Sequence, residues 1–251
     1  MVMSKLEAIE KSLEKHGLSH ILGSPFDNAF DVFDNEKEDI NLILLGTNGN
    51  MTDAIKTNLE WVKERARNPK YSHLLSGDWG VSPLRKELIK LPDVLNECFG
   101  NTMFSVSNMI LTNGLLLASN GVGDIKNQFD ILRSETNIFS NLKDLLNASM
   151  GFFDDFVVKN SSPRVIFAYG NADPGHSAWK YLRDYYPKLK ETVTVPIKST
   201  SYKFCSLDIH GEEVFVIGSP HPSFHYNKLN KELIKEGLGK VGAIPYLKQS
   251  V

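Results

Sequence analysis

The sequence predicts an α/β fold, a three-layer α/β/α sandwich with a central, mostly parallel, four-stranded sheet. Three observations predict it. Four short apolar runs rich in Leu, Ile and Val have the composition of buried strands. Amphipathic segments at helical spacing separate these runs. Each run ends in a polar loop that contains Gly or Asn. We expect one such domain over residues 41–251, preceded by an acidic helical extension, residues 1–40, that packs on it.

The expected elements alternate along the chain. Apolar runs predict strands at residues 41–46, 109–117, 164–170 and 213–218. Apolar residues at helical spacing predict helices at residues 4–16, 51–67, 82–99, 140–156 and 176–185. The helix at 82–99 opens with Ser-Pro, which is typical of a first helical turn. Residues 203–209 and 212–217 flank a His-Gly pair and are predicted to form a β-hairpin that feeds the last strand.

Composition excludes several classes of protein. The chain has 251 residues, of which 41% are hydrophobic and 23% charged, values ordinary for a globular domain. Cys98 and Cys205 are too few for a four-cysteine metal site or a disulfide framework, and we expect both to be buried and reduced. No apolar run reaches the ~18 residues of a membrane span. The charged N-terminus lacks the apolar core of a secretory signal. We therefore expect a cytoplasmic protein, or a nuclear one if its source is eukaryotic.

Charge is distributed unevenly along the chain. The net charge of −2 does not indicate a nucleic-acid binder. Residues 1–40 carry nine acidic side chains against four lysines, whereas residues 180–203 and 228–251 are basic. A basic C-terminal third is suited to face phosphates, although a solvated lysine-rich surface has the same composition.

Polar loops follow all four predicted strands, at residues 46–50, 112–121, 169–176 and 218–227. Ligands of open parallel sheets bind at the carboxyl ends of the strands. We therefore expect these loops to converge on one site that is rich in Asn, His and backbone amides and poor in charged groups.

The sharpest local signal is the tripeptide His221-Pro222-Ser223 after the last strand. Prolines on both sides of the imidazole stiffen the loop, and an imidazole held in place can donate to developing negative charge. Ser223 can donate to a phosphate oxygen. The alternative is a turn histidine followed by a capping serine. A metal site would need further ligands such as His210 and His225, but no HExxH-type spacing occurs, so we expect no metal.

Asn113 and Trp79 are candidate ligands of a nucleobase. Asn113 stands in an apolar strand end, where a buried amide must find partners. It either bonds the neighbouring backbone or reads a base, because a carboxamide donates and accepts at once and so matches the edge of a pyrimidine. Trp79 lies in a Gly-rich loop, where a large aromatic is either a core plug or a base-stacking platform worth ~1–3 kcal/mol.

Residues 46–50 read Gly-Thr-Asn-Gly-Asn and follow the first strand. The small residues around Asn48 let the backbone approach a ligand closely, and a simple turn is the alternative. The stretch lacks the Gly-Lys-Ser/Thr ending of a Walker loop and is not a GxGxxG motif, so triphosphate and dinucleotide binding are not favoured.

In their order along roughly residues 40–235, these loops resemble the motifs of the uracil-DNA glycosylase superfamily. The first-strand motif of that superfamily, G-x-[D/N/E]-P-[Y/G], holds the attacking water, and GTNGN places Asn48 at the catalytic position. The strand-end Asn that reads the base corresponds to Asn113. YGNADPGHSAWKYL matches the small-residue loop before a helix, and GSPHPSFHYN matches the last motif. Trp79 falls where many members stack an aromatic on the base.

The sequence departs from the superfamily pattern at several positions. Gly49 stands where a proline normally follows the catalytic residue. Asn48 is an amide, as in the single-strand-selective and mismatch-specific branches, and an amide orients a water without accepting its proton. We therefore expect slower turnover than in Asp enzymes, or a different base. Phe224 and His225 stand at the wedge, and the four cysteines of the iron–sulfur branches are missing.

The resemblance implies a monofunctional glycosylase that flips a damaged base out of DNA and hydrolyses its glycosidic bond, as in base excision repair. It implies that Asn48 with Asp53 positions the water, that His221 stabilises charge on the leaving base and that Asn113 pairs with uracil. The remaining implied roles are base binding by Trp79, Gly46 and Thr47, filling of the vacated stack by Phe224 with His225, and phosphate or DNA contacts by Ser223, Lys228, Lys231, Asn171 and Ser177. We expect a monomer that binds single- or double-stranded DNA, with no cofactor and no membrane.

Two other interpretations stay open. One is a protein of the same fold that binds nucleic acid without catalysis, which the missing proline and the mildly acidic charge favour. The other is an α/β hydrolase or transferase of a small molecule that uses Ser219 or Ser223 with His221 and Asp173. No G-x-S-x-G nucleophile elbow occurs in the sequence.

Overall fold

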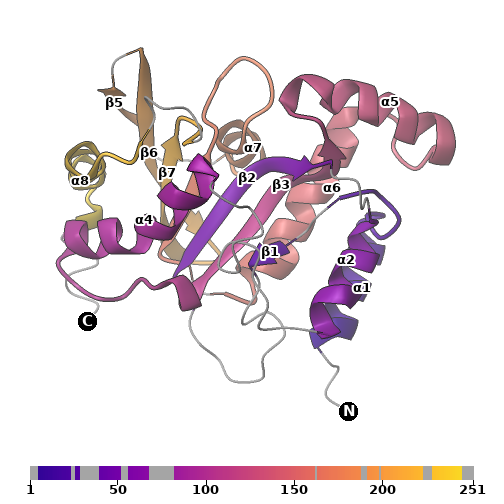
Figure 1. Ribbon diagram of the computed structural model, residues 1–251, viewed down its shortest axis with the longest axis horizontal. Helices are drawn as coiled ribbons and strands as arrows, with labels where there is room; N and C mark the ends of the chain where they lie inside the picture. The colour runs from indigo at the N-terminus through magenta and orange to yellow at the C-terminus, as the bar shows by residue number, and fades with distance from the viewer. Residues whose placement is uncertain are drawn as a thin grey trace.

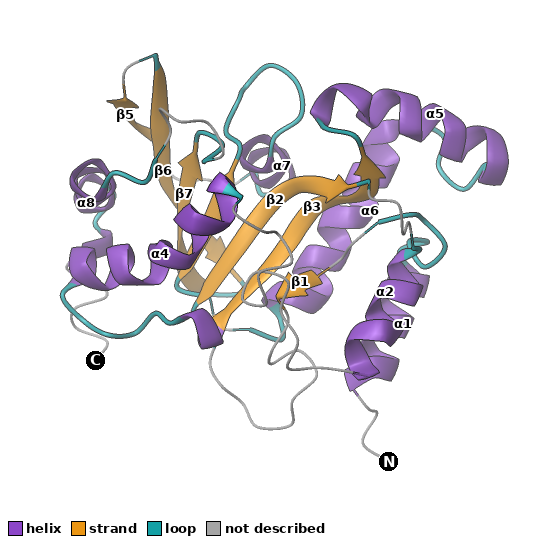
Figure 2. Ribbon diagram, viewed as in Figure 1, coloured by secondary structure: helices purple, strands orange, loops and turns teal. Residues whose placement is uncertain are grey.

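The computed structural model of the protein describes residues 5–23, 26–28, 40–51, 56–67, 82–161, 163–187, 191–197, 199–222 and 228–244. Over these ranges the chain forms an α/β fold in which a mixed sheet carries helices on both faces (Figures 1 and 2). The α/β class expected from the sequence is confirmed.

The described part of the sheet has seven strands in the order β1-β3-β2-β4-β7-β6-β5. They are β1 (Phe26–Asn28), β2 (Leu42–Asn50), β3 (Met109–Ser119), β4 (Val165–Tyr169), β5 (Val193–Ile197), β6 (Thr200–Ile209) and β7 (Glu212–Ser219). The four predicted strands are β2, β3, β4 and β7. They pair in parallel in the middle of the sheet, in the order β3-β2-β4-β7.

The expected limit of four strands is wrong, because antiparallel strands extend the sheet on both sides. β1 pairs with β3, β6 with β7 and β5 with β6. The β6–β7 pair is the predicted hairpin, and His210 and Gly211 form its turn with φ values of 54° and 86°. The sequence of β5 does not have a clear strand pattern, because it contains Pro196. An edge strand such as β5 tolerates a proline.

The helices of the described ranges are α1 (Lys5–Lys15), α2 (Asn58–Arg67), α4 (Pro83–Phe99), α5 (Ile125–Thr136), α6 (Leu142–Phe152), α7 (Ala178–Tyr185) and α8 (Lys231–Lys240). A π-helical turn, η3 (Phe153–Val158), continues α6, and single 3-10 turns, Val106–Asn108 and Val122–Asp124, precede β3 and α5. The predicted helices correspond to α1, α2, α4, α6 with η3, and α7, whereas α5 and α8 were not predicted. None of these helices is both long enough and apolar enough to cross a membrane.

The predicted helix at 51–67 is shorter than expected at its N-terminal end. β2 continues as a strand through Asn50, and α2 begins only at Asn58. Thr57 and Glu60 form a reciprocal cap: the Thr57 backbone N–H donates to Glu60 Oε2 at 2.7 Å, and the Glu60 backbone N–H donates to Thr57 Oγ1 at 3.2 Å. This pair satisfies backbone donors that the first helical turn leaves open, and so fixes the start of the helix.

Two apolar clusters cover the two faces of the sheet. Ile43 and Leu45 of β2 belong to a cluster formed with α1, α2, α5, α6 and α7. Leu42 and Leu44 alternate with them and belong to a second cluster formed with α4 and α8. Because side chains alternate along a strand, the apolar run of β2 fills both faces, as an interior parallel strand requires.

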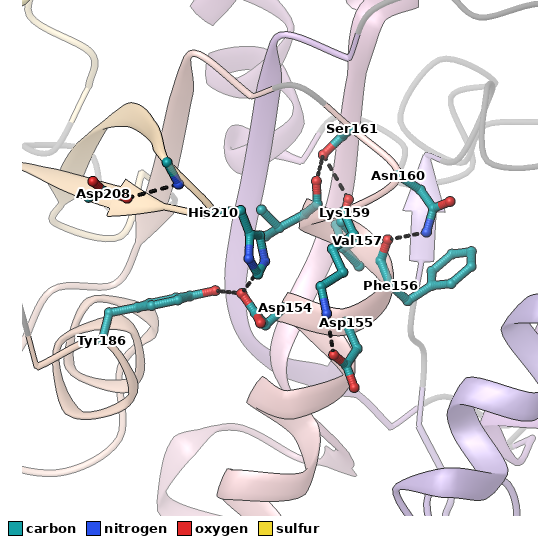
Figure 3. Close-up of polar contacts among 12 residues, drawn as sticks. Asp154, Asp155, Phe156, Val157, Lys159, Asn160, Ser161, Tyr186, Asp208 and His210 are labelled. Carbon is teal, nitrogen blue, oxygen red and sulfur yellow. Dashed lines mark hydrogen bonds and ion pairs between the residues drawn. The ribbon is translucent and has the colours of Figure 1, made fainter.

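A polar network joins segments at the amino edge of the parallel strands (Figure 3). Asp154 of η3 accepts a hydrogen bond from the Tyr186 hydroxyl at 2.6 Å and lies 3.1 Å from His210 Nε2. The next residue, Asp155, lies 3.1 Å from His16 Nε2. The network therefore ties the β6–β7 turn, the end of α7 and the end of α1 to one helical turn.

Both cysteines are buried and free, as expected from the sequence. Burial raises the pKa of the Cys98 thiol to about 11 and that of the Cys205 thiol to about 12. Both thiols therefore stay protonated at neutral pH and behave as small apolar side chains.

Candidate functional site

The carboxyl ends of the four parallel strands meet at one edge of the sheet. Gly46 of β2 pairs with Asn113 of β3, Leu45 of β2 pairs with Ala168 of β4, and Ala168 pairs in turn with Gly218 of β7. The strand ends that carry the predicted site residues are therefore neighbours in space.

Asn113 and Tyr169 converge on Gly46 from the strands on either side of β2. A methyl group on Gly46 would lie 2.6 Å from Asn113 Oδ1 and 2.4 Å from the Tyr169 hydroxyl oxygen. Both distances are below the 3.0 Å that real Cβ atoms respect, so a side chain here would displace one group or both. Glycine is needed because two polar groups lie beside the same point of the backbone.

His221 lies next to this pair, directly after β7. Its ring is edge-on to the ring of Tyr169, with the two centroids 5.7 Å apart and the planes at 71°. Burial lowers the pKa of the His221 imidazole below its ordinary value, so the ring is neutral at neutral pH. A neutral imidazole still donates one N–H, and it can stabilise charge that develops on a bound group.

Sequence reasoning missed Tyr169. It ends an apolar run and is only 7% exposed, so its pattern is that of a core residue. Its position could have identified it as a candidate site residue, since it is the last residue of a parallel strand and precedes Gly170 in one of the converging loops.

Thr47 lies on the other side of the β2 backbone, against the loop that follows β4. A Cβ on Gly170 would lie 3.1 Å from Thr47 Oγ1, and Gly170 has a φ of 105°. The Gly170 backbone N–H donates to the Ser219 carbonyl at 2.8 Å. Thr47 is therefore packed under the loop, at the same edge as Gly46.

Asn171 and Ser177, expected to contact DNA, turn their side chains into the protein. Asn171 Nδ2 donates to the Ser201 carbonyl at 2.7 Å and to the Gly218 carbonyl at 2.9 Å. The Ser177 hydroxyl donates to the Ala172 carbonyl at 2.7 Å, accepts from the first turn of α7 and is 1% exposed. Both residues fix the shape of the loop between β4 and α7, and their amide and hydroxyl donors serve that role.

Ion pairs hold the same loop from outside. Lys203 Nζ donates to the Asn171 carbonyl at 2.9 Å and also pairs with Asp173. Arg183 lies 2.6 Å from Asp173. The Lys203 ammonium, with Arg183, holds the pKa of Asp173 below its ordinary value. Asp173 is therefore a structural anion whose partners among the described residues are Lys203 and Arg183, whereas the small-molecule hydrolase interpretation pairs it with a histidine.

Ser219 also fits that hydrolase interpretation poorly. Its side chain is fully buried, and its hydroxyl donates to the Pro220 carbonyl at 2.8 Å. A nucleophilic serine needs an exposed hydroxyl that is bonded to a base.

Asn48 lies two residues beyond Gly46 on β2 and is half-buried. Its Nδ2 donates to the Gly49 carbonyl and to Ser119 Oγ, both at 2.7 Å. The pairing of β2 with β3 is irregular at this point. These two hydrogen bonds fix the plane of the carboxamide and leave Oδ1 as the atom that can orient a water.

The two lysines expected to contact phosphates differ in their surroundings. Lys228 is exposed just before α8, and its carbonyl accepts a hydrogen bond from the Tyr202 hydroxyl at 3.3 Å. Lys231 is paired with Glu97 at 2.5 Å. Lys228 therefore offers its charge to solvent, whereas a phosphate would have to compete with a carboxylate for Lys231.

Five of the predicted site residues lie outside the described residues: Asp53, Trp79, Ser223, Phe224 and His225. Among the residues that the structure does describe, no group of three or more His, Cys, Asp or Glu side chains is arranged to hold a metal ion.

Comparisons of the chain with protein-family models, with curated proteins and with solved structures found no match.

Proposed function

We propose that the protein is a DNA glycosylase of the uracil-DNA glycosylase type, which removes uracil or a related deaminated base from DNA by hydrolysis. The observation that carries the proposal is the group formed by Asn113, Gly46 and His221 at the carboxyl edge of the parallel strands. It brings together a carboxamide, a neutral imidazole and a glycine whose missing side chain lets the carboxamide lie close to β2, which suits a planar heterocycle with carbonyl and N–H groups.

The Asn113 carboxamide would recognise the base. Its Nδ2 can donate to O4 of uracil while Oδ1 accepts from N3–H. Cytosine has its donor and acceptor reversed at the same two positions. Because Gly46 has no side chain, this carboxamide can lie against the β2 backbone with its oxygen beside Gly46.

His221 would assist the departure of the base. When the C1′–N1 bond breaks, its electron pair leaves with the base and negative charge develops at O2. A neutral imidazole held by the flanking prolines donates to that oxygen without a proton being consumed. The sugar passes through an oxocarbenium-like state.

Asn48 would position the water that completes the reaction. Its Nδ2 is held by Ser119 and the Gly49 carbonyl, so Oδ1 has a fixed direction in which to accept a hydrogen bond from water. The water oxygen bonds to C1′, and its released proton neutralises the departing base. Because an amide cannot take that proton itself, the reaction is expected to be slower than with a carboxylate at this position.

An excision assay tests the proposal. A labelled oligonucleotide with one uracil, single-stranded or paired with G or A, is incubated with the protein in EDTA and then cleaved at abasic sites with hot alkali. We expect alkali-dependent cleavage by the wild type and its loss, by roughly 100-fold or more, in Asn113→Ala and His221→Ala. The matched controls are Asn147→Ala and His20→Ala, which alter exposed residues of the same types.

The outcomes separate the interpretations. Cleavage that survives EDTA and falls only in the two site variants supports the proposal. Absence of cleavage with uracil, hypoxanthine, xanthine and 5-hydroxymethyluracil would overturn it, and retained DNA binding in that case would favour a non-catalytic nucleic-acid-binding protein.

A further inference from the structure

The proposed function requires one particular orientation of the Asn113 carboxamide, and it does not explain what fixes that orientation. Rotating a carboxamide by 180° about its last bond exchanges its donor and its acceptor without changing its shape. One orientation matches O4 and N3–H of uracil, and the other matches the amino group and N3 of cytosine. Since normal DNA is full of cytosine, a second group must fix the orientation of the amide.

Tyr169 is placed to do so. Its hydroxyl oxygen and Asn113 Oδ1 reach the same point above Gly46, at 2.4 Å and 2.6 Å from where a Cβ would stand. They come from β4 and β3, the strands on either side of β2. A tyrosine hydroxyl can donate or accept, but donation from a phenol to an amide oxygen is the stronger of the two hydrogen bonds. The hydroxyl therefore favours the orientation that turns Oδ1 toward it, and that oxygen keeps a second lone pair for a ligand.

The Tyr169 hydroxyl is itself held in position. The ring is 7% exposed and belongs to the apolar cluster under α4 and α8, and the His221 ring lies edge-on against it. A side chain packed in this way has little freedom to follow a rotating amide. A rigid neighbour therefore biases the orientation of Asn113, as discrimination between two ligands of equal shape requires.

We propose that Tyr169 is a positioning residue, whose hydroxyl holds the Asn113 carboxamide in the orientation that reads a carbonyl group next to a ring N–H. The substrate class follows from it: pyrimidines or purines with that carbonyl and N–H, such as uracil and hypoxanthine, and not the amino-bearing bases cytosine and adenine. The inference rests on the proposed function, since it concerns the same site.

Tyr169→Phe tests the inference. The substitution removes only the hydroxyl and keeps the ring that packs against His221. Release of free base is measured under single-turnover conditions from single-stranded oligonucleotides that carry one uracil or one cytosine as the labelled base. We expect the ratio of uracil release to cytosine release to fall roughly 2- to 10-fold, because one neutral hydrogen bond biases the two orientations by that much. The release of cytosine should rise. Tyr185→Phe, on α7, is the matched control and should keep the wild-type ratio.

The ratio separates a positioning role from a structural one, because general damage to the site lowers the release of both bases together. If the wild type releases uracil and Tyr169→Phe keeps the wild-type ratio, the role of Tyr169 is overturned while the proposed function stands. If the wild type releases no base of the panel above, the proposed function fails, and this inference fails with it.

Discussion

At Gly46, the missing side chain is what lets the Asn113 carboxamide and the Tyr169 hydroxyl approach the β2 backbone. The three residues come from three adjacent strands, so their arrangement depends on the register of the sheet. A change as small as one methyl group is expected to disturb it.

Gly46→Ala should therefore impair both stability and activity. The added methyl forces Tyr169 or Asn113 to move, at a cost of about 1–3 kcal/mol in the free energy of unfolding. Misplacing these groups by about 1 Å is expected to reduce base release roughly 100-fold. Chemical denaturation and the excision assay measure the two effects. Gly123→Ala is the control, since a methyl there meets nothing within 4 Å. Equal stability and activity of Gly46→Ala and the wild type would contradict the described geometry.

The protonation state of His221 gives a second prediction at the residue scale. Because burial lowers its pKa, the imidazole should titrate with a midpoint below the ordinary value of 6.5. The unfolded chain then binds a proton more readily than the folded one, so this residue lowers stability as the pH falls below about 6.5. NMR titration of the His221 ring protons, assigned by comparison with His221→Gln, measures the midpoint. A midpoint at or above 6.5 would refute a buried, neutral ring.

At the scale of elements, the π-helical turn η3 connects parts of the fold that are far apart in sequence (Figure 3). Asp154 is bonded to Tyr186 after α7 and lies beside His210 in the β6–β7 turn. β7 runs from that turn to the His221 loop, so this amino-edge contact helps to hold the strand that positions the imidazole.

Tyr186→Phe tests the contribution of this connection. Removing the hydroxyl leaves a largely buried Asp154 carboxylate without one of its donors, which should lower the free energy of unfolding by about 1–3 kcal/mol. Urea denaturation provides the measurement. The neighbouring substitution Tyr185→Phe is the control and should cost less. If the two variants were equally stable, the hydrogen bond from Tyr186 to Asp154 would have no measurable role.

The strands that could be predicted from the sequence are those that are buried on both faces of the sheet. β2, β3, β4 and β7 are buried on both faces, so each contains a short apolar run that is easy to recognise. β5 contains Pro196 and α8 contains Gly237 and Gly239, residues that weaken a strand or helix pattern. Their positions depend on packing against the rest of the fold; a Cβ on Gly237, for example, would meet the Phe204 ring at 2.1 Å.

For the whole molecule, the location of the candidate site follows from topology alone, because parallel strands bring their carboxyl ends together. The sequence could not reveal which way each polar side chain turns. Asn171 and Ser177 look like ligand-binding residues in the sequence, yet they bond the loop to the sheet and to α7. Tyr169 looks like a core residue, yet its hydroxyl reaches Gly46. The direction in which each of these side chains points depends on its contacts with residues that are distant in the sequence, and the sequence pattern does not show those contacts.

We propose that the carboxyl edge of the parallel strands recognises and releases a deaminated base. The most direct test of this proposal is the release of free uracil from a single-stranded oligonucleotide by the purified wild type in EDTA, followed by mass spectrometry, with Asn113→Ala alongside. We expect free uracil and an intact sugar–phosphate backbone with the wild type, and at least about a 100-fold slower release with the variant. Release that is equally fast with both proteins, or absent with the wild type, would contradict the proposal.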